Sequence, residues 1–343
     1  MAPGPSAVFD GCEIEVPPRL QIIPTGNLGN QMLQVMLTET LQHRLPSLQV
    51  GGLTLVDWGL RRQLAEPLRS KPLRLIGQYV DLQLLARLLE TGVLRELELA
   101  ALGFRMSHYL PRAQYASLFP RRAGLESPVG SNTLLINVRG AETLENTHAD
   151  YGPIPVSFYS QLVGSTGLTP VFMGQIGVDR YSDALRRAFP AALFLPSRGA
   201  MGDFELIRSA QHIVVSVSTF SWLAAWFSDA QSIHLPVVGM FNPHQRPDID
   251  LLPLNDSRYH FYRFPVRHWT GSPDQFEALE AAASYPQLSN LDAQAGLTLA
   301  TAQLTRRTSA YRRSLVIEAL ANRLLRLPGR VGLRVDAIKS TET

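Results

Sequence analysis

The sequence has a single cysteine, Cys12, among 343 residues, so an internal disulfide cannot form. One thiol near a proline-rich terminus also excludes a thiolate catalyst and a zinc site of the Cys/His kind. Charged residues are scarce at 18%, whereas hydrophobic residues make up 45%, a balance typical of a folded globular protein. These absences predict a globular protein of a reducing compartment.

Long apolar runs are also missing, so we expect no segment that crosses a bilayer. The first residues lack the basic start and apolar core of a secretory signal, which predicts a cytoplasmic location. From Ala300 onward the chain has nine basic and three acidic residues, giving this tail +6; the total of +3 therefore leaves −3 for the rest of the chain. The body thus carries no general nucleic-acid footprint, and we expect no nucleic-acid partner.

The stretch 202–227 has three parts: a short amphipathic helix pattern, an apolar β-branched run and a second helix pattern that opens on Ser218 and Thr219. A buried strand that runs into a hydroxyl-rich helix start suits a phosphate, because free backbone N–H groups and the helix dipole converge there. Simple capping of a core helix explains the same two residues equally well.

A similar strand, turn and helix stand near the N-terminus, where an apolar run at 20–24 precedes the sequence TGNLGNQ at 25–31. Gly26 and Gly29 would allow a tight turn and leave the helix start open to a ligand. The turn lacks the GxGxxG pattern of dinucleotide-binding proteins, and a purely structural turn remains the default interpretation.

After a Gly-, Ser- and Pro-rich boundary at 124–131, strand and helix patterns alternate regularly. The strands are expected at 133–139, 169–173, 192–196, 212–217 and, as the last, 231–238. This alternation predicts an α/β fold with a parallel sheet covered by helices on both faces. Ligands of such sheets bind beyond the carboxyl ends of the strands, where Arg139 and Ser218 would both lie.

Arg139 is a candidate phosphate ligand because its guanidinium can bind two phosphate oxygens at once, although a structural ion pair is equally compatible. The loop that follows supplies candidate general bases at Glu142, Glu145, His148 and Asp150. The acidic pair at 248–250 superficially looks like a metal–nucleotide site, but it lies away from the phosphate edge, and solvated or structural carboxylates are the preferred interpretation.

Three segments together resemble the α1,2-fucosyltransferase family (glycosyltransferase family 11). They are GNLGNQMLQ from Gly26, NVRGAE at 137–142 and SVSTFSWLAAW at 216–226, in the family's order. The second segment departs from the usual His-x-Arg-Arg-x-Asp: Arg139 is kept, whereas Asn137, Gly140 and Glu142 replace the histidine, the second arginine and the aspartate. The chain therefore looks like a divergent member with an eroded second motif.

The resemblance implies an inverting, metal-independent transferase that moves fucose from GDP-fucose to a glycan hydroxyl, without a cofactor, on a bacterial surface polysaccharide or lipopolysaccharide precursor. It implies two Rossmann-like domains facing a cleft, the GT-B arrangement, with a C-terminal helical tail. The expected segments are an unstructured lead-in (1–18), an acceptor-side domain (19–125), a nucleotide-sugar domain (126–270) and a helical basic tail (271–343).

The expected site combines the residue chemistry with this resemblance. Arg139 would stabilise the departing diphosphate, and Glu142 would take the acceptor proton. Asp203 would bind the nucleoside, by the resemblance alone. The expected diphosphate ligands are Gly26, Asn27, Gly29, Asn30, Ser218, Thr219, Phe220 and Ser221.

Two questions stay open in the sequence. The eroded motif leaves room for a different nucleotide sugar or for a non-catalytic protein that binds a nucleotide or glycan. The tail has helical spacing at 311–327, with an apolar stripe of Ile317, Leu320, Ala321 and Leu324 beside several arginines. Packing of this stripe on the parent domain is the preferred interpretation, and peripheral contact with the inner, anionic face of a membrane is the second.

Overall fold

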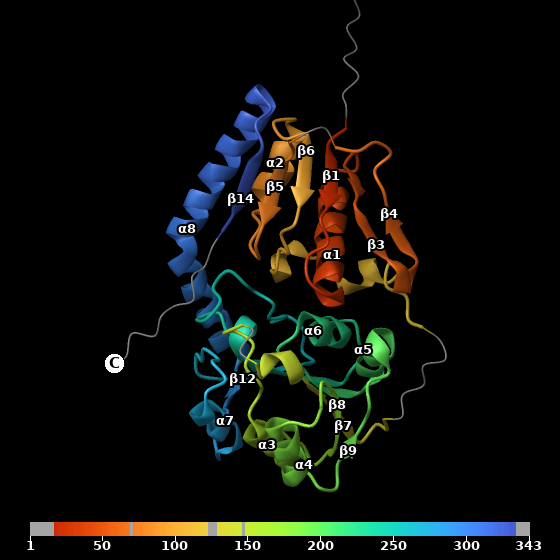
Figure 1. Cartoon of the computed structure of the whole chain (residues 1–343), viewed down its shortest axis with the longest axis vertical. Helices are drawn as coiled ribbons and strands as arrows, with labels where there is room; N and C mark the ends of the chain where they lie inside the picture. The colour runs from red at the N-terminus through yellow and green to blue at the C-terminus, as the bar shows by residue number, and fades with distance from the viewer. Residues whose placement is uncertain (1–16, 69–70, 123–128, 146–147, 334–343) are drawn as a thin grey trace, which may run out of the picture.

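The computed structural model describes residues 17–68, 71–122, 129–145 and 148–333. They form two α/β domains, which lie one above the other in Figure 1. The predicted fold class of two Rossmann-like domains with a C-terminal helix is therefore confirmed. Cys12, most of the predicted lead-in and most of the predicted boundary at 124–131 lie outside the described residues.

The N-terminal domain is built on a five-stranded parallel sheet in the order β14-β5-β6-β1-β2. Its strands are β1 (Arg19–Ile22), β2 (Gln49–Gly51), β5 (Leu73–Ile76), β6 (Glu96–Leu99) and β14 (Gly329–Gly332). Its helices are α1 (Leu28–Arg44) and α2 (Leu82–Glu90), and a small antiparallel hairpin joins β3 (Leu53–Leu55) to β4 (Leu60–Arg62). Alternation of buried leucines along β5 and β6 directs one face of each strand into the core.

The C-terminal domain is built on a seven-stranded sheet in the order β13-β12-β11-β10-β7-β8-β9. The strands are β7 (Thr133–Val138), β8 (Thr169–Gly174), β9 (Leu193–Phe194), β10 (His212–Val214), β11 (Ser232–Val237), β12 (Tyr259–Arg263) and β13 (Gln287–Leu288). Every pairing is parallel except that of β12 with β13. The sequence predicted the strand at 231–238 to be the last one. That prediction is wrong, because β12, β13 and β14 follow it.

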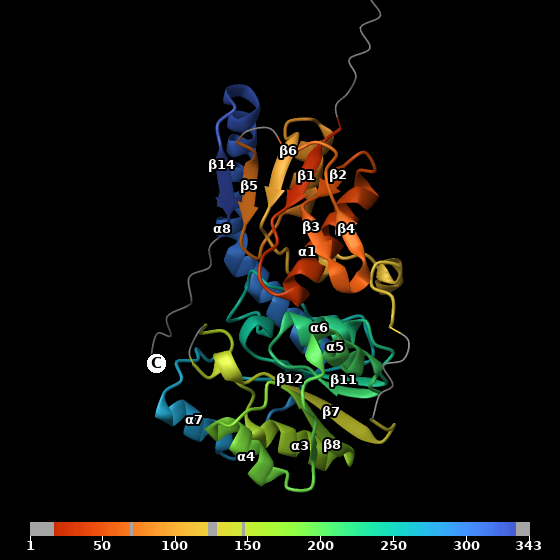
Figure 2. The same ribbon diagram turned by 45° about the vertical axis from the view of Figure 1, so that its right-hand side comes forward.

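Helices α3 (Val156–Thr166), α4 (Arg180–Ala188), α5 (Gly199–Ser209), α6 (Thr219–Trp226) and α7 (Pro273–Glu280) belong to this second domain. Figures 1 and 2 both place α5 and α6 between the two sheets, with the start of α1 directly above α6. Short 3-10 helices complete the chain: η1 (Val56–Trp58), η2 (Met106–His108), η3 (Arg112–Tyr115), η4 (Ala141–Thr143) and η5 (Gly239–Phe241).

The C-terminal segment ties the two domains together. The 36-residue helix α8 (Asn290–Leu325) runs from the lower domain up the side of the upper one, and β14 then adds an edge strand to the N-terminal sheet (Figure 1). Tyr311, Leu315 and Ala319 are the α8 residues buried against the N-terminal domain. The prediction that Ile317, Leu320 and Leu324 pack on the parent domain is wrong, because all three are exposed.

The strand orders determine where a ligand would bind. In the seven-stranded sheet the chain moves outward from β7 to β9 on one side, then returns to place β10 on the other side of β7. In the five-stranded sheet β1 likewise lies between β2 and β6. Such topological switch points leave a crevice beyond the carboxyl ends of the flanking strands. A ligand of this fold would therefore meet the residues that follow β1, β7 and β10.

Candidate functional site

The starts of α1 and α6 meet at the junction of the two domains. The hydroxyl Oγ1 of Thr219 donates a hydrogen bond to Oδ1 of Asn30 at 2.8 Å, across 189 residues of sequence. Gly29 lies so close to α6 that a Cβ atom placed on it would come within 2.6 Å of the Phe220 amide nitrogen. The structure thus brings the first and third sequence motifs together, and Gly29 is required for that close approach.

The start of α6 is capped by Ser218. This residue has an extended backbone (φ −153°, ψ 133°), and its side chain accepts a hydrogen bond from the Phe220 amide at 3.2 Å. Thr219 and Phe220 follow as half-buried first-turn residues, where backbone amides have no acceptor within the helix. Ser221 differs, because it is fully buried and its hydroxyl accepts from the Ser216 amide at 3.2 Å. Ser221 therefore supports the turn from within and offers no surface to a ligand.

Arg139 lies beside this helix start. Nη1 of Arg139 donates to the carbonyl oxygen of Val217 at 2.7 Å, and the guanidinium carbon stands 4.7 Å from the ring centre of Tyr151. The position follows from strand register: Ile136 of β7 pairs with Val214 of β10, so Arg139 and Val217 extend the two neighbouring strands by the same number of residues. The positive charge is thereby fixed at the switch point, next to the first turn of α6.

A buried hydrogen bond holds these two strand extensions together. Ser216 donates from its hydroxyl to Oδ1 of Asn137 at 2.6 Å. Next to Arg139, Gly140 packs so tightly that a Cβ atom would lie 2.6 Å from the carbonyl oxygen of Gln175. A second arginine at position 140 would therefore require this backbone to move. Asn137 and Gly140 are thus both closely packed in this structure.

The start of α1 is arranged differently. Asn27 is exposed, and its side chain makes no capping hydrogen bond to the helix. Gly26 has a left-handed backbone (φ +70°), and its carbonyl oxygen accepts from Nε2 of Gln31 at 3.0 Å. Gln34, which was not among the residues predicted from the sequence, is fully buried and fixes the turn by accepting from the Thr25 amide at 3.1 Å. A polar residue on an otherwise apolar helix face was the signal for it.

The loop after Arg139 holds the candidate bases. Glu142 lies in η4, and its side chain is outside the described part of the structure. Glu145 is exposed. His148 is about half exposed, and burial lowers the pKa of its imidazole, with Arg246 and Arg139 acting in the same direction against Asp150. At neutral pH His148 is therefore uncharged, and its Nδ1 accepts from the Asp150 amide at 3.2 Å.

Asp150 belongs to a buried ionic cluster. Nη1 of Arg246 contacts Oδ2 of Asp150 at 2.9 Å, and the same guanidinium bonds Asp248 at 2.9 and 2.7 Å. Burial alone would lower the pKa of Arg246, but its bonds to Asp248 and Asp150 raise it above the ordinary value. The carboxylates of Asp150 and Asp248 are thus committed to a cation, which favours the structural interpretation for the Asp248 member of the acidic pair at 248–250. Within the described ranges, no cluster of three or more His, Cys, Asp or Glu could hold a metal ion.

Asp203 lies in α5 and fixes the loop that enters this helix. Its Oδ2 accepts from the Ser197 hydroxyl at 2.6 Å, and its Oδ1 accepts from the Arg198 amide at 2.8 Å. The carboxylate is nearly buried, with 9% of the residue exposed. Asp203 therefore holds the loop at Ser197 and Arg198 in place, and its expected role in binding a nucleoside stays a prediction.

No protein-family model and no curated protein matches the sequence. Among solved structures, the chain is similar to a variant of Arabidopsis thaliana FUT1 in complex with GDP, at 11% identity and a TM-score of 0.41, over 64% of this chain and 70% of that one. It is also similar to TibC, a dodecameric iron-containing heptosyltransferase in complex with ADP-D-beta-D-heptose, at 13% identity and a TM-score of 0.36. This second similarity covers 84% of this chain and 77% of TibC. The fold assignment rests on the two sheets described above.

Proposed function

We propose that the protein is a glycosyltransferase that takes a sugar from a nucleotide sugar and passes it to a hydroxyl of a glycan. One observation carries the proposal: Arg139 and the start of α6 lie together at the switch point of the seven-stranded sheet. That point is where doubly wound sheets bind nucleotides. A cation and a helix start side by side form a site for a diphosphate.

The chemistry of sugar transfer suits this pair of groups. When the bond between the sugar and the diphosphate breaks, negative charge builds up on the departing phosphate oxygens. Arg139 and the Thr219 amide at the start of α6 would stabilise that charge. The Ser218 hydroxyl would be a further donor, whereas the Thr219 hydroxyl already donates to Asn30. These groups are preorganised, because the guanidinium is already held by the Val217 carbonyl. We infer that this stabilisation does not require a metal ion.

The start of α1 would close the site from the other domain. The Asn27 side chain makes no capping bond there, and Asn30 is already bonded to Thr219. Glu142 follows Arg139 by three residues, and we propose it as the base that removes the proton of the acceptor hydroxyl. Asp150 is a poor alternative, since Arg246 already holds its carboxylate.

GDP-fucose is the proposed donor, on the basis of the motif resemblance. Thermal-shift measurements with GDP, UDP, ADP and their sugars test the nucleotide, and slow hydrolysis of each nucleotide sugar tests the donor. We expect GDP and GDP-fucose to raise the melting temperature most, and GDP-fucose to be hydrolysed. Preference for another nucleotide would overturn the donor while keeping the reaction class. No response to any nucleotide would overturn the site.

The replaced second motif supports a second candidate, a non-catalytic protein that binds a nucleotide or glycan. Gly140 has no room for the arginine that the family pattern carries there. The same measurements separate the two candidates. Binding of GDP without hydrolysis or transfer of any nucleotide sugar, tested against a pool of acceptor glycans, would favour the binding protein.

A further inference from the structure

Helix α8 exposes an apolar face that its own packing leaves uncovered. Its inward face is formed by small and apolar residues at helical spacing: Ala293, Leu297, Ala300, Leu304, Tyr311, Leu315 and Ala319. Near the C-terminal end of the helix, Ile317 is 64% exposed, Leu320 41% and Leu324 73%. Leu325, the last residue of the helix, and Leu327, which lies beyond it, are also exposed, at 67% and 48%. A helix whose inward stripe is already packed has no structural need for a second apolar stripe facing outward.

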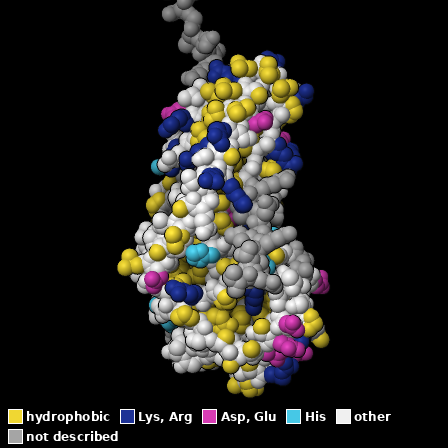
Figure 3. Space-filling model, turned by 90° about the vertical axis from the view of Figure 1, so that its left-hand side faces the viewer, with side chains coloured by type: hydrophobic (Ala, Val, Ile, Leu, Met, Phe, Trp, Pro, Cys, Tyr) yellow, Lys and Arg dark blue, Asp and Glu magenta, His cyan; other side chains and the backbone are white. Residues whose placement is uncertain are grey.

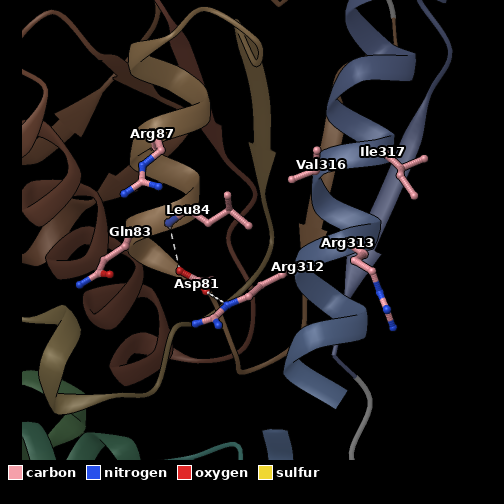
Figure 4. Close-up of a pocket in the computed structure, with 8 residues that line it drawn as sticks. All are labelled: Asp81, Gln83, Leu84, Arg87, Arg312, Arg313, Val316 and Ile317. Carbon is pink, nitrogen blue, oxygen red and sulfur yellow. Dashed lines mark hydrogen bonds and ion pairs between the residues drawn. The ribbon is translucent and has the colours of Figure 1, made fainter. Parts of the chain in front are cut away.

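Arginines share this outward face. At 100° per residue, Arg306 and Arg313 fall in the same arc of about 60° as Ile317, Leu320 and Leu324. We call these five residues the α8 patch; all five are exposed. Figure 4 shows Arg313 and Ile317 pointing away from α2, whereas Arg312 and Val316 point toward it. Figure 3, which faces this side of the molecule, shows basic and apolar side chains intermingled over its upper half.

The charges beside the patch have one predominant sign. Arg323, Arg326 and Arg330 are exposed around its C-terminal end, and Glu318 is the half-buried acidic residue of that turn. Arg312 is different because its guanidinium bonds the Asp81 carboxylate. A groove of about 560 Å³ runs between α2 and α8; it adds Arg87 and borders the patch at Arg313 and Ile317 (Figure 4).

We propose that the α8 patch docks on an anionic lipid bilayer. Apolar side chains that alternate with arginines on one helix face can enter the headgroup region while the guanidinium groups bind lipid phosphates. A second copy of the chain is a less suitable occupant, because self-association would bring like-charged arginine clusters together. The proposal does not depend on the sugar that the site uses. It assigns α8 two roles: one face joins the domains, and the other holds the protein on a membrane.

The test is co-sedimentation of the full chain with phosphatidylcholine vesicles that contain or lack phosphatidylglycerol. We expect binding to the anionic vesicles, weakened by salt, and at least tenfold less binding to neutral ones. The variant Ile317→Ser/Leu320→Ser/Leu324→Ser should lose at least tenfold in partitioning. Its matched control, Val56→Ser/Val178→Ser/Leu193→Ser, removes exposed apolar side chains elsewhere and should bind normally.

Charge reversal gives a second arm. The variant Arg313→Glu/Arg323→Glu should bind anionic vesicles at least tenfold less tightly, whereas Arg263→Glu on the exposed side of β12 should change binding about twofold at most. Equal binding by the patch and control variants would overturn the proposal. So would a lack of binding to anionic vesicles, or a dimer in light scattering that the serine variant dissolves, because the patch would then serve another partner.

Discussion

Two helix starts face each other at the domain junction, and they are built differently. At the start of α6 the Ser218 side chain caps the Phe220 amide, and Arg139 lies beside this turn. At the start of α1 the Asn27 side chain makes no capping hydrogen bond, and Gly29 packs closely against Phe220 of α6. We call Arg139 and the start of α6 at Ser218 and Thr219 the cradle, which is rigid and positively charged. We call the start of α1 at Asn27 to Asn30 the cover, which is closely packed and adds hydrogen-bond donors. We therefore assign binding of the diphosphate to α6 and closure of the site to α1.

Both glycines of the first motif have a structural role in this junction, whether or not a ligand binds there. Gly26 provides the left-handed turn, and Gly29 permits the contact with Phe220. A structural role and a functional role of the motif therefore rest on the same geometry.

Replacement of Arg139 by alanine removes the cation of the cradle. We expect turnover of the nucleotide sugar to fall about 100- to 1,000-fold, because charge on the departing diphosphate would lose its preorganised partner. Steady-state kinetics measure the effect, and an unchanged far-ultraviolet circular dichroism spectrum controls for folding. Normal turnover in this variant would show that the diphosphate does not bind at the start of α6.

Replacement of Gly29 by alanine would force the cover away from the cradle. A Cβ atom there meets backbone at 2.6 Å, so we expect a loss of about 1–3 kcal/mol in the free energy of unfolding. The control is Gly164→Ala in α3, where nothing lies within 4 Å of the added atom. Urea unfolding should show this control unchanged or slightly more stable; equal losses in both variants would contradict the contact.

The bond between Thr219 and Asn30 joins the two starts directly. A double-mutant cycle with Thr219→Val and Asn30→Ala should give a coupling energy of about 1 kcal/mol, since each single change removes the same hydrogen bond. The quantity measured is the free energy of unfolding of the four proteins. Additive losses would mean that the helices approach without this bond.

The smallest expected difference is between the two caps. Ser218→Ala should cost about 1 kcal/mol because it removes the acceptor of the Phe220 amide. Asn27→Ala should cost less, since the Asn27 side chain makes no capping bond. Comparison of their unfolding midpoints in urea decides the matter, and a larger loss for Asn27→Ala would reverse our assignment of cradle and cover.

The sequence predicted the parts of this arrangement that are local. Strand and helix periods located β7 to β11, and the geometry of a parallel sheet placed Arg139 near Ser218. The pairing of β14 with β5 could not be predicted from the sequence, because a four-residue strand near the end of the chain carries no local signal of its partner strand. The bond from Thr219 to Asn30 spans 189 residues and depends on how two complete domains meet.

Helix α8 shows a second limit of periodicity. It carries two apolar stripes, one through Leu315 and one through Ile317, and both have helical spacing. Spacing identifies a stripe but does not say which stripe meets the sheet. The stripe through Ile317, which was predicted to pack on the domain, is the one that is exposed. Within the described residues, no helix has the length and apolar character to cross a bilayer.

If the protein binds a nucleotide sugar, its diphosphate should lie between Arg139 and the start of α6. A crystal structure of the protein with GDP is the decisive test. We expect phosphate oxygens within hydrogen-bond distance of the Arg139 guanidinium and the Thr219 amide, with Asn27 or Asn30 approaching from the other domain. A nucleotide bound elsewhere, with this junction empty, would contradict it.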